Sequence, residues 1–132
     1  MEVIVVRSNR RNELIDIDQQ VADIVSKSEI KEGICSIYAP HATCGIMINE
    51  NYDPNICLDI IDCLSEYIPQ GKWRHDKIDN NADAHIKASI VGPSETIPIK
   101  DGNLLMGTWQ SIMLADFDGP RERRIIVNII KS

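Results

Sequence analysis

The 132-residue sequence lacks the segments that would place it in a membrane or on an export pathway. It has no run of roughly 18 consecutive apolar residues, the length that a membrane-spanning helix requires. Its first residues, Met-Glu-Val-Ile-Val-Val-Arg, lack the basic start and the longer apolar stretch of a signal peptide. These absences predict a cytoplasmic protein with no membrane partner.

The sequence also lacks a surplus of basic residues. Its 14 Lys and Arg residues stand against 20 Asp and Glu residues, which gives a net charge of −6 and an isoelectric point near 5.0. Non-specific nucleic-acid binding needs an excess of Lys and Arg that neutralises phosphates, so nucleic acid is not an expected partner. The hydrophobic fraction of 43% and the chain length favour one globular domain over residues 1–132.

A C-x-x-C motif is missing as well, although the chain has four cysteines. Without a sign of export or a zinc-type spacing, neither disulfides nor a cysteine metal site is expected. Each cysteine lies in an apolar run, where a thiol behaves as a small hydrophobic group. We therefore expect buried, reduced thiols at Cys35, Cys44, Cys57 and Cys63.

The apolar patterns predict an α+β fold with about seven strands and two or three helices. Strands are expected at residues 2–6, 13–17, 34–39, 45–49, 95–99, 111–117 and 123–130. Asp18 is expected to cap a helix that runs through Lys27, and Asp53-Pro54 to begin an amphipathic helix that ends at Pro69. Residues 72–84 form a polar connection, and residues 85–91 fit either a strand or a helix.

The sequence has only three histidines, and they lie on three separate segments: His41, His75 and His85. Three imidazoles that converge could hold Zn²⁺ or a related ion and leave a fourth position for water or substrate. They match no short zinc motif, so the residue pattern alone favours surface or hydrogen-bonded histidines. Without a metal, a histidine could still act as a general acid or base.

Further polar residues follow predicted strands. Glu50 ends an apolar strand, where its carboxylate could bind Mg²⁺, act as a base or simply be solvated. Asp53, just beyond it, is accounted for as a helix cap. Trp109 also lies beside a predicted strand, and a tryptophan there is more often part of the core than a ligand platform.

Two segments could bind an anion. Arg121 follows a Gly-Pro turn and could present its guanidinium group to a phosphate, or it could pair with Asp118. Ser94 and Thr96 follow Gly92-Pro93, where exposed backbone N–H groups could form an anion-binding nest. The sequence has no G-x-x-x-x-G-K-[ST] motif that would identify a nucleotide phosphate site.

Several short motifs follow one another in order: His41-Ala-Thr, Asn49-Glu50-Asn-Tyr-Asp53-Pro54, His75, Asn81-Ala-Asp-Ala-His85, Gly92-Pro-Ser, Gly107-Thr-Trp-Gln110 and Asp118-Gly-Pro-Arg121. Together they resemble the YjbQ-like family, whose members are described as secondary thiamine-phosphate synthases. The resemblance spans essentially the whole chain. One departure is Ala42-Thr43-Cys44, where the family has hydroxyl-rich or small residues and where a thiol could alter the reactivity near His41.

The resemblance implies packed, mostly antiparallel sheets with flanking helices, and a homotrimer whose sites lie near subunit interfaces. It implies an enzyme that joins a hydroxymethylpyrimidine diphosphate to a thiazole phosphate and releases pyrophosphate, as a side activity of a histidine-rich site. The expected catalytic residues are His41, Glu50, His75 and His85. The expected substrate-binding residues are Asn81, Ser94, Thr96, Trp109, Gln110 and Arg121.

The cofactor and the reaction each have open alternatives. A divalent metal, Zn²⁺ or Mg²⁺, could be held by His41, His75 and His85, and no organic cofactor is evident. The first alternative function is a metal-dependent hydrolase or lyase that acts on a small phosphorylated metabolite. The second is a non-catalytic trimeric protein that binds a small anion.

Overall fold

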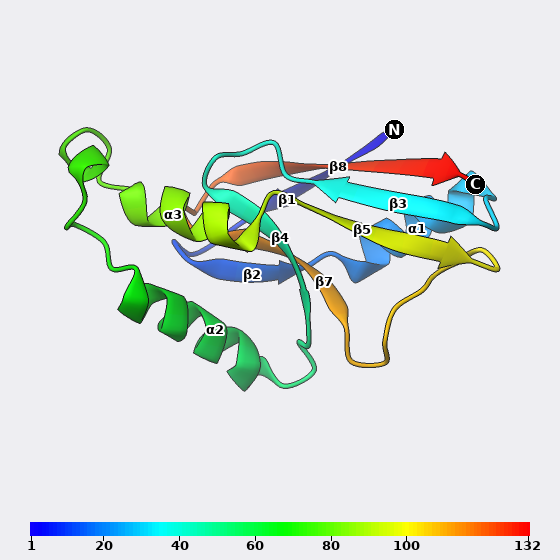
Figure 1. Cartoon of the computed structure of the whole chain (residues 1–132), viewed down its shortest axis with the longest axis horizontal. Coiled ribbons are helices and arrows are strands. Elements are labelled where there is room, and N and C mark those ends of the chain that lie inside the picture. The colour runs from blue at the N-terminus through cyan, green and yellow to red at the C-terminus, as the bar shows by residue number, and fades with distance from the viewer.

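The computed structural model describes all residues from 1 to 132, in eight strands, three α-helices and one 3₁₀ turn (Figure 1). In chain order these are β1 (Glu2–Arg7), β2 (Glu13–Asp16), α1 (Asp18–Ser28), β3 (Gly33–Tyr38), β4 (Cys44–Asn49), α2 (Pro54–Tyr67), η1 (Arg74–Lys77), α3 (Ala82–Val91), β5 (Ser94–Lys100), β6 (Asn103–Leu104), β7 (Ser111–Asp116) and β8 (Glu122–Lys131). None of the helices combines the length and the apolar character that a bilayer span needs.

The strands form two antiparallel sheets, which confirms the predicted α+β class. The larger sheet has the order β1-β8-β3-β5-β6, and the smaller has the order β2-β7-β4. The main core lies between them and includes Ile37 and Ile125 of the larger sheet, Ile46 and Leu114 of the smaller sheet, and Val21 of α1. Packing two sheets so that each buries one apolar face against the other is a common way to build a two-layer fold.

Strand β7 is the central strand of the smaller sheet, and every one of its residues is buried. Ile112 and Leu114 face the larger sheet, whereas Ala115 packs with Ala84 and Ala88 of α3 in a second, smaller cluster. The small alanine side chains let α3 approach the sheet closely. Residues 85–91, for which the sequence allowed either a strand or a helix, belong to a helix that begins at Ala82.

The two predicted helix starts have different outcomes. Asp53 caps α2 as predicted, since its carboxylate accepts a hydrogen bond from the N–H of Asn55 at 2.9 Å. The predicted cap at Asp18 is wrong, because Ile17 occupies the N-cap position and has no side-chain cap bond. The carboxylate of Asp18 instead accepts the N–H of Ile112 at 2.7 Å and so ties α1 to β7.

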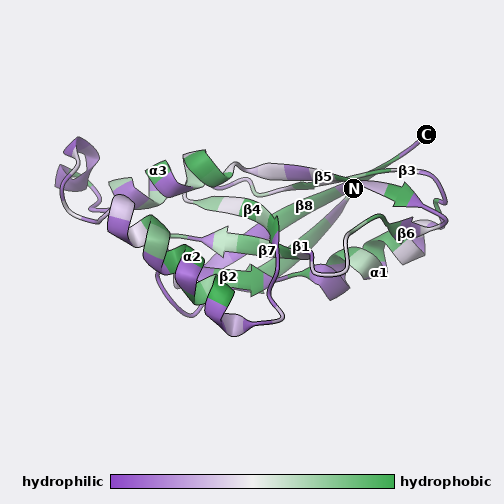
Figure 2. Ribbon diagram, turned by 60° about the horizontal axis from the view of Figure 1, so that its bottom comes forward, coloured by the Kyte–Doolittle hydropathy of each residue, from purple (hydrophilic) through white to green (hydrophobic).

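The expectation of four buried thiols is half right. All four cysteines are free, and Cys35 and Cys44 are buried, where burial raises their thiol pKa values to about 11 and about 12. Cys57 is only half-buried and Cys63 is exposed. The physical reason is that no residue of α2 is fully buried, so its apolar stripe only partly covers the small sheet. Figure 2 shows the alternating hydrophobic and hydrophilic residues along α2.

Candidate functional site

Two of the three histidines meet where the polar connection joins α3. The rings of His75 and His85 lie edge to face, with centroids 5.0 Å apart. Together with Trp73, Ala82 and Ile86 they line an open pocket of about 290 Å³. The Nε2 atom of His75 is shielded from solvent without a hydrogen-bond partner, and its nearest acidic group, Asp79 Oδ2, is 3.6 Å away. An unpaired buried nitrogen is unfavourable by itself, which makes this atom a candidate for contact with a ligand.

Asp76 fixes the loop that carries His75. Its carboxylate accepts the backbone N–H groups of Trp73 at 2.9 Å, Ala82 at 2.9 Å and Gly71 at 3.0 Å. The bond from Trp73, with those from Ala82 and Gly71, lowers the pKa of Asp76 below its ordinary value. One side chain therefore closes the hydrophilic loop around η1, visible in Figure 2, onto the first residue of α3.

Asn81 stands at the start of α3, one turn before His85 and so on the same helix face. Its backbone carbonyl accepts the N–H of His85 at 3.3 Å, and its side-chain Nδ2 donates to Asp118 Oδ2 at 2.9 Å. Its Oδ1 is shielded from solvent and has no partner. The histidine pair thus adjoins a second unsatisfied polar atom, and Asn81 links it to the turn between β7 and β8.

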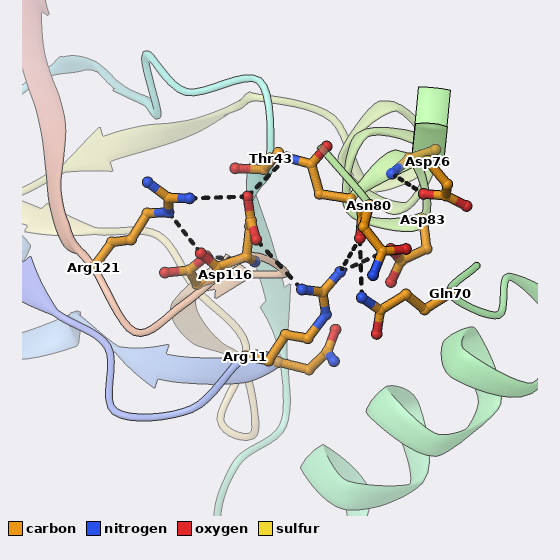
Figure 3. A network of polar contacts seen from close by, with 12 residues as sticks. Arg11, Thr43, Gln70, Asp76, Asn80, Asp83, Asp116 and Arg121 are labelled. Atoms are coloured by element: carbon orange, nitrogen blue, oxygen red, sulfur yellow. Dashed lines mark hydrogen bonds and ion pairs between the residues drawn. The ribbon is translucent and has the colours of Figure 1, made fainter. Parts of the chain in front are cut away.

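Asp118 is the centre of that turn. Its two carboxylate oxygens lie 3.5 Å from Arg11 Nη1 and 3.4 Å from Arg121 Nη2, and Arg121 Nε donates to the Asp118 carbonyl at 2.8 Å. The pairing of Arg121 with Asp118 that the sequence allowed is therefore present. Arg121 still exposes 58% of its side chain, and its Nη1 forms no hydrogen bond within the chain. Figure 3 shows Arg11 and Arg121 on either side of this network.

Three functional candidates at this end were not identified from the sequence: Arg11, Asp83 and Lys87. Arg11 Nη2 lies 2.9 Å from Asp83 Oδ1, and Asp83 Oδ2 lies 3.4 Å from Lys87 Nζ. The side chains of Asp83 and Lys87 are each only 2% exposed. Burial lowers the pKa of Lys87, while the adjacent Asp83 opposes that shift. The i, i+4 spacing of the pair would have revealed it once the segment was recognised as helical.

A second buried ion pair joins the same end of the two sheets. Arg123 binds both carboxylate oxygens of Asp116, at 2.8 and 3.0 Å, and also donates to Thr43 at 2.9 Å. Ser8 donates to Asp116 at 2.7 Å. Burial alone would raise the pKa of Asp116, but the hydrogen bonds from Arg123 and Ser8 hold it below its ordinary value. Because protein groups already bind both carboxylate oxygens of Asp116, we assign this ion pair a structural role.

Arginine is concentrated at this end of an acidic chain. Residues 7–12 and 118–124 hold six of the seven arginines and only two acidic residues, a net of +4 in a chain of net −6. The two segments are neighbours because β1 pairs with β8, and the N–H of Gly119 donates to the carbonyl of Arg11 at 3.0 Å. This end therefore attracts anions.

His41 does not join the other two histidines. It lies in the connection between β3 and β4, and its Nε2 accepts the backbone N–H of Arg124 at 3.0 Å. Burial, and then the charge of Arg123, lower the pKa of His41. The chain alone holds no group of three His, Cys, Asp or Glu side chains that could bind a metal ion. His75 and His85 could supply two ligands, and the three-histidine set stays a prediction.

Glu50, Trp109 and Gln110 lie at the opposite end of the smaller sheet. Strands β4 and β7 pair from Cys44↔Asp116 to Asn49↔Ser111, which places these residues beyond the second pair and His41 beyond the first. A six-residue strand spans about 17 Å, so one chain cannot gather both groups around one small ligand.

Trp109 is 61% exposed, so it lies outside the core, and its role in substrate binding stays a prediction. Its ring meets that of Tyr52 edge to face, with centroids 5.6 Å apart. The side-chain oxygen of Gln110 accepts the N–H of Gly107 at 2.8 Å and closes the loop that presents Trp109. This end is therefore an exposed, ordered aromatic surface.

Ser94 and Thr96 lie on β5, where they pair with Tyr38 and Ser36 of β3. Both are exposed, and they follow the C-terminal end of α3, whereas Asn81 and His85 lie in its N-terminal half. The structure therefore separates them from the histidine pair by most of the helix.

Comparison with known proteins assigns the family. A family model described as "UPF0047 protein YjbQ-like" matches residues 2–132. The chain belongs to this YjbQ-like family. Membership confirms the resemblance drawn from the ordered motifs.

Individual relatives of the YjbQ-like family agree over nearly the full chain. The UPF0047 protein MJ1081 of Methanocaldococcus jannaschii is 51% identical over 125 residues, covering 95% of this chain and 90% of that protein. The UPF0047 protein YugU of Bacillus subtilis is 35% identical over 133 residues, covering 98% of both. A crystal structure of a YbjQ-like protein of unknown function from Sulfolobus solfataricus P2 has a TM-score of 0.96 at 42% identity, covering 99% of this chain and 96% of that one.

Proposed function

We propose that the chain is an enzyme that acts on a small phosphorylated metabolite at the end of the molecule that holds His75, His85, Asn81 and Arg121. The observation that carries the proposal is the meeting of two kinds of group there. One is a histidine pair with an unpaired ring nitrogen, and the other is a local excess of arginine. Histidine transfers protons near neutral pH, and arginine binds phosphate.

The specific reaction we propose is that of a thiamine-phosphate synthase, as the resemblance implies. The bond between the methylene carbon of a hydroxymethylpyrimidine diphosphate and its diphosphate oxygen breaks, and the diphosphate leaves with the electron pair. A bond then forms between that carbon and the ring nitrogen of a thiazole phosphate. Arg121 stabilises the charge on the leaving group, and His75 or His85 donates a proton to it. A divalent cation, when bound, neutralises further charge on the diphosphate.

A homotrimer is part of this proposal. Glu50 and Trp109 lie a strand length away from the turn at Asp118, which Asn81 connects to the histidine pair, so a site that uses both groups needs a neighbouring copy. The exposed Tyr52–Trp109 surface is suited to such a contact, because large aromatic side chains are enriched where proteins meet.

The test is an assay of the purified chain with the two substrates and Mg²⁺, followed by detection of thiamine phosphate. We expect product, and we expect His85→Ala to lower its rate by at least about a hundredfold, as removal of a general acid does. Ser89→Ala, one turn further along the same helix, is the matched control and should retain the activity. Product that persists unchanged in His85→Ala, or no product from any preparation, would refute the proposal.

A further inference from the structure

Two arginines from segments far apart in the sequence share one carboxylate. Arg11, between β1 and β2, and Arg121, between β7 and β8, lie 3.5 and 3.4 Å from the two oxygens of Asp118. Charge-assisted hydrogen bonds between such groups are usually about 2.7–2.9 Å long. Both contacts are therefore loose, and with Lys87 the two arginines carry one more positive charge than Asp83 and Asp118 together balance.

Both guanidinium groups can still reach a ligand. Arg121 has a free Nη1 and exposes more than half of its side chain, and Arg11 exposes 33% of its side chain. Between them, Asn81 donates to the same carboxylate and leaves its shielded Oδ1 without a partner. The surroundings therefore supply several donors for an oxyanion and one acceptor for a neighbouring N–H or O–H of the ligand.

Arg11 is held in place independently of Asp118. Its Nη2 forms a 2.9 Å ion pair with the buried Asp83 and also lies 3.4 Å from the carbonyl of Asn80, which accepts a second bond from Gln70 (Figure 3). Asp83 is in turn fixed by the buried Lys87. A donor that is ordered before the ligand arrives loses less entropy on binding.

We infer that Arg11 and Arg121 form a clamp for the phosphate or diphosphate group of a small ligand, and that Asp118 holds the two arginines until the anion takes its place. A tetrahedral phosphate presents several acceptor oxygens, which match two converging guanidinium groups better than one carboxylate does. This inference refines the proposed function, because it names the residues that hold the phosphate. Its test measures binding, so it can fail or succeed separately from turnover.

The probe is inorganic pyrophosphate, titrated into the purified chain and followed by calorimetry. We expect saturable binding that Arg121→Gln weakens at least about tenfold, because a charge-assisted hydrogen-bonded contact is lost. The matched control is Arg10→Gln, which removes the same charge from an exposed arginine beside Arg11 and should change the affinity less than about threefold. Equal losses in both variants would mean diffuse attraction and would overturn the clamp.

Arg11→Lys is the second variant, because it retains the positive charge opposite Asp83 but removes the planar fork. It should fold, as shown by an unchanged circular dichroism spectrum, and weaken pyrophosphate binding about as much as Arg121→Gln. Wild-type affinity in Arg11→Lys would show that Arg11 does not touch the anion.

Asp118→Asn tests the role of the carboxylate. If the anion displaces Asp118 from the arginines, the variant binds pyrophosphate at least about fivefold more tightly, since the internal competitor has lost its charge. Glu122→Gln removes an equal charge from the start of β8 and should have a smaller effect. Equal gains in both variants, or weaker binding in Asp118→Asn, would contradict the exchange. Binding without any turnover would leave the clamp intact and refute the proposed enzyme.

Discussion

The imidazole of His41 completes the hydrogen bonding of Arg124 in the larger sheet. Strands β3 and β8 pair up to Tyr38↔Ile126, so Arg124 lies beyond the last residue of β8 that pairs with β3. His41 Nε2 accepts the N–H of Arg124 at 3.0 Å and lies 3.2 Å from its carbonyl oxygen. The neutral ring with its proton on Nδ1 satisfies the N–H of Arg124, which leaves only Nδ1 for other contacts.

This contact predicts a pH dependence of stability. Burial and Arg123 lower the pKa of His41 in the folded chain below the 6.5 of an unperturbed histidine. As the pH falls below 6.5, the unfolded chain takes up a proton that the folded chain does not, so the folded state loses stability until its own pKa is reached. Above pH 6.5 the effect vanishes. Urea unfolding at pH 7.5 and pH 5 should show a smaller loss for His41→Gln than for the wild type. Equal losses would contradict the assignment.

Removing one charge of the buried Asp83–Lys87 pair should destabilise the fold more than removing both charges. Lys87→Met leaves Asp83 in the interior with only the part-exposed Arg11 as its partner, and should lower the free energy of unfolding by about 3 kcal/mol. The double variant Asp83→Asn with Lys87→Met should be less destabilised than Lys87→Met alone, because no charge stays buried. Lys72→Met, outside this pair, is the control. Chemical denaturation measures all three, and additive losses would show that the pair does not interact.

Strand and helix positions were largely predictable because they follow local patterns. Asp53-Pro54 predicted the start of α2 through capping chemistry that depends on neighbouring residues alone. The cap at Asp18 failed because a backbone N–H from β7, distant in sequence, takes its carboxylate. The α3 segment was ambiguous because its alanines, Asp83 and Lys87 give no apolar period, although tertiary contacts bury them.

The site was only partly predictable for the same reason. The sequence contained His75 and His85 as candidates, yet their contact depends on three hydrogen bonds from Asp76 to backbone groups. Arg11 was missed because its role arises from the pairing of β1 with β8, which brings it beside the β7–β8 turn. Residues that act through tertiary neighbours leave no local signal in the sequence.

Loss of the Asp76 carboxylate should loosen the loop that carries His75 without unfolding the rest of the chain. Asp76→Ala removes the acceptor for three backbone N–H groups and should release the loop that carries His75. Lys72, Arg74 and Lys77 are trypsin sites in this segment, so limited proteolysis should cleave the variant at least about tenfold faster there. Asp79→Ala is the matched control, since Asp79 is exposed and lies 3.6 Å from His75 without a hydrogen bond. Equal cleavage rates in both variants would show that Asp76 does not order the loop.

Adding a side chain at Gly119 should lower both the stability of the fold and the affinity for pyrophosphate. A Cβ atom at this position would collide with the carbonyl oxygen of Arg10 and the hydroxyl of Ser8, so the two turns that carry Arg11 and Arg121 would have to separate. Gly119→Ala should therefore lower the melting temperature by several degrees, which corresponds to about 1–3 kcal/mol of overpacking. It should also weaken pyrophosphate binding about tenfold or more, since the arginines must lie within about 3 Å of the anion. Gly107→Ala is the control, because its Cβ would meet only the side chain of Gln110, at 3.4 Å. If Gly119→Ala melts earlier but binds pyrophosphate normally, the separation of the two turns does not matter to the clamp.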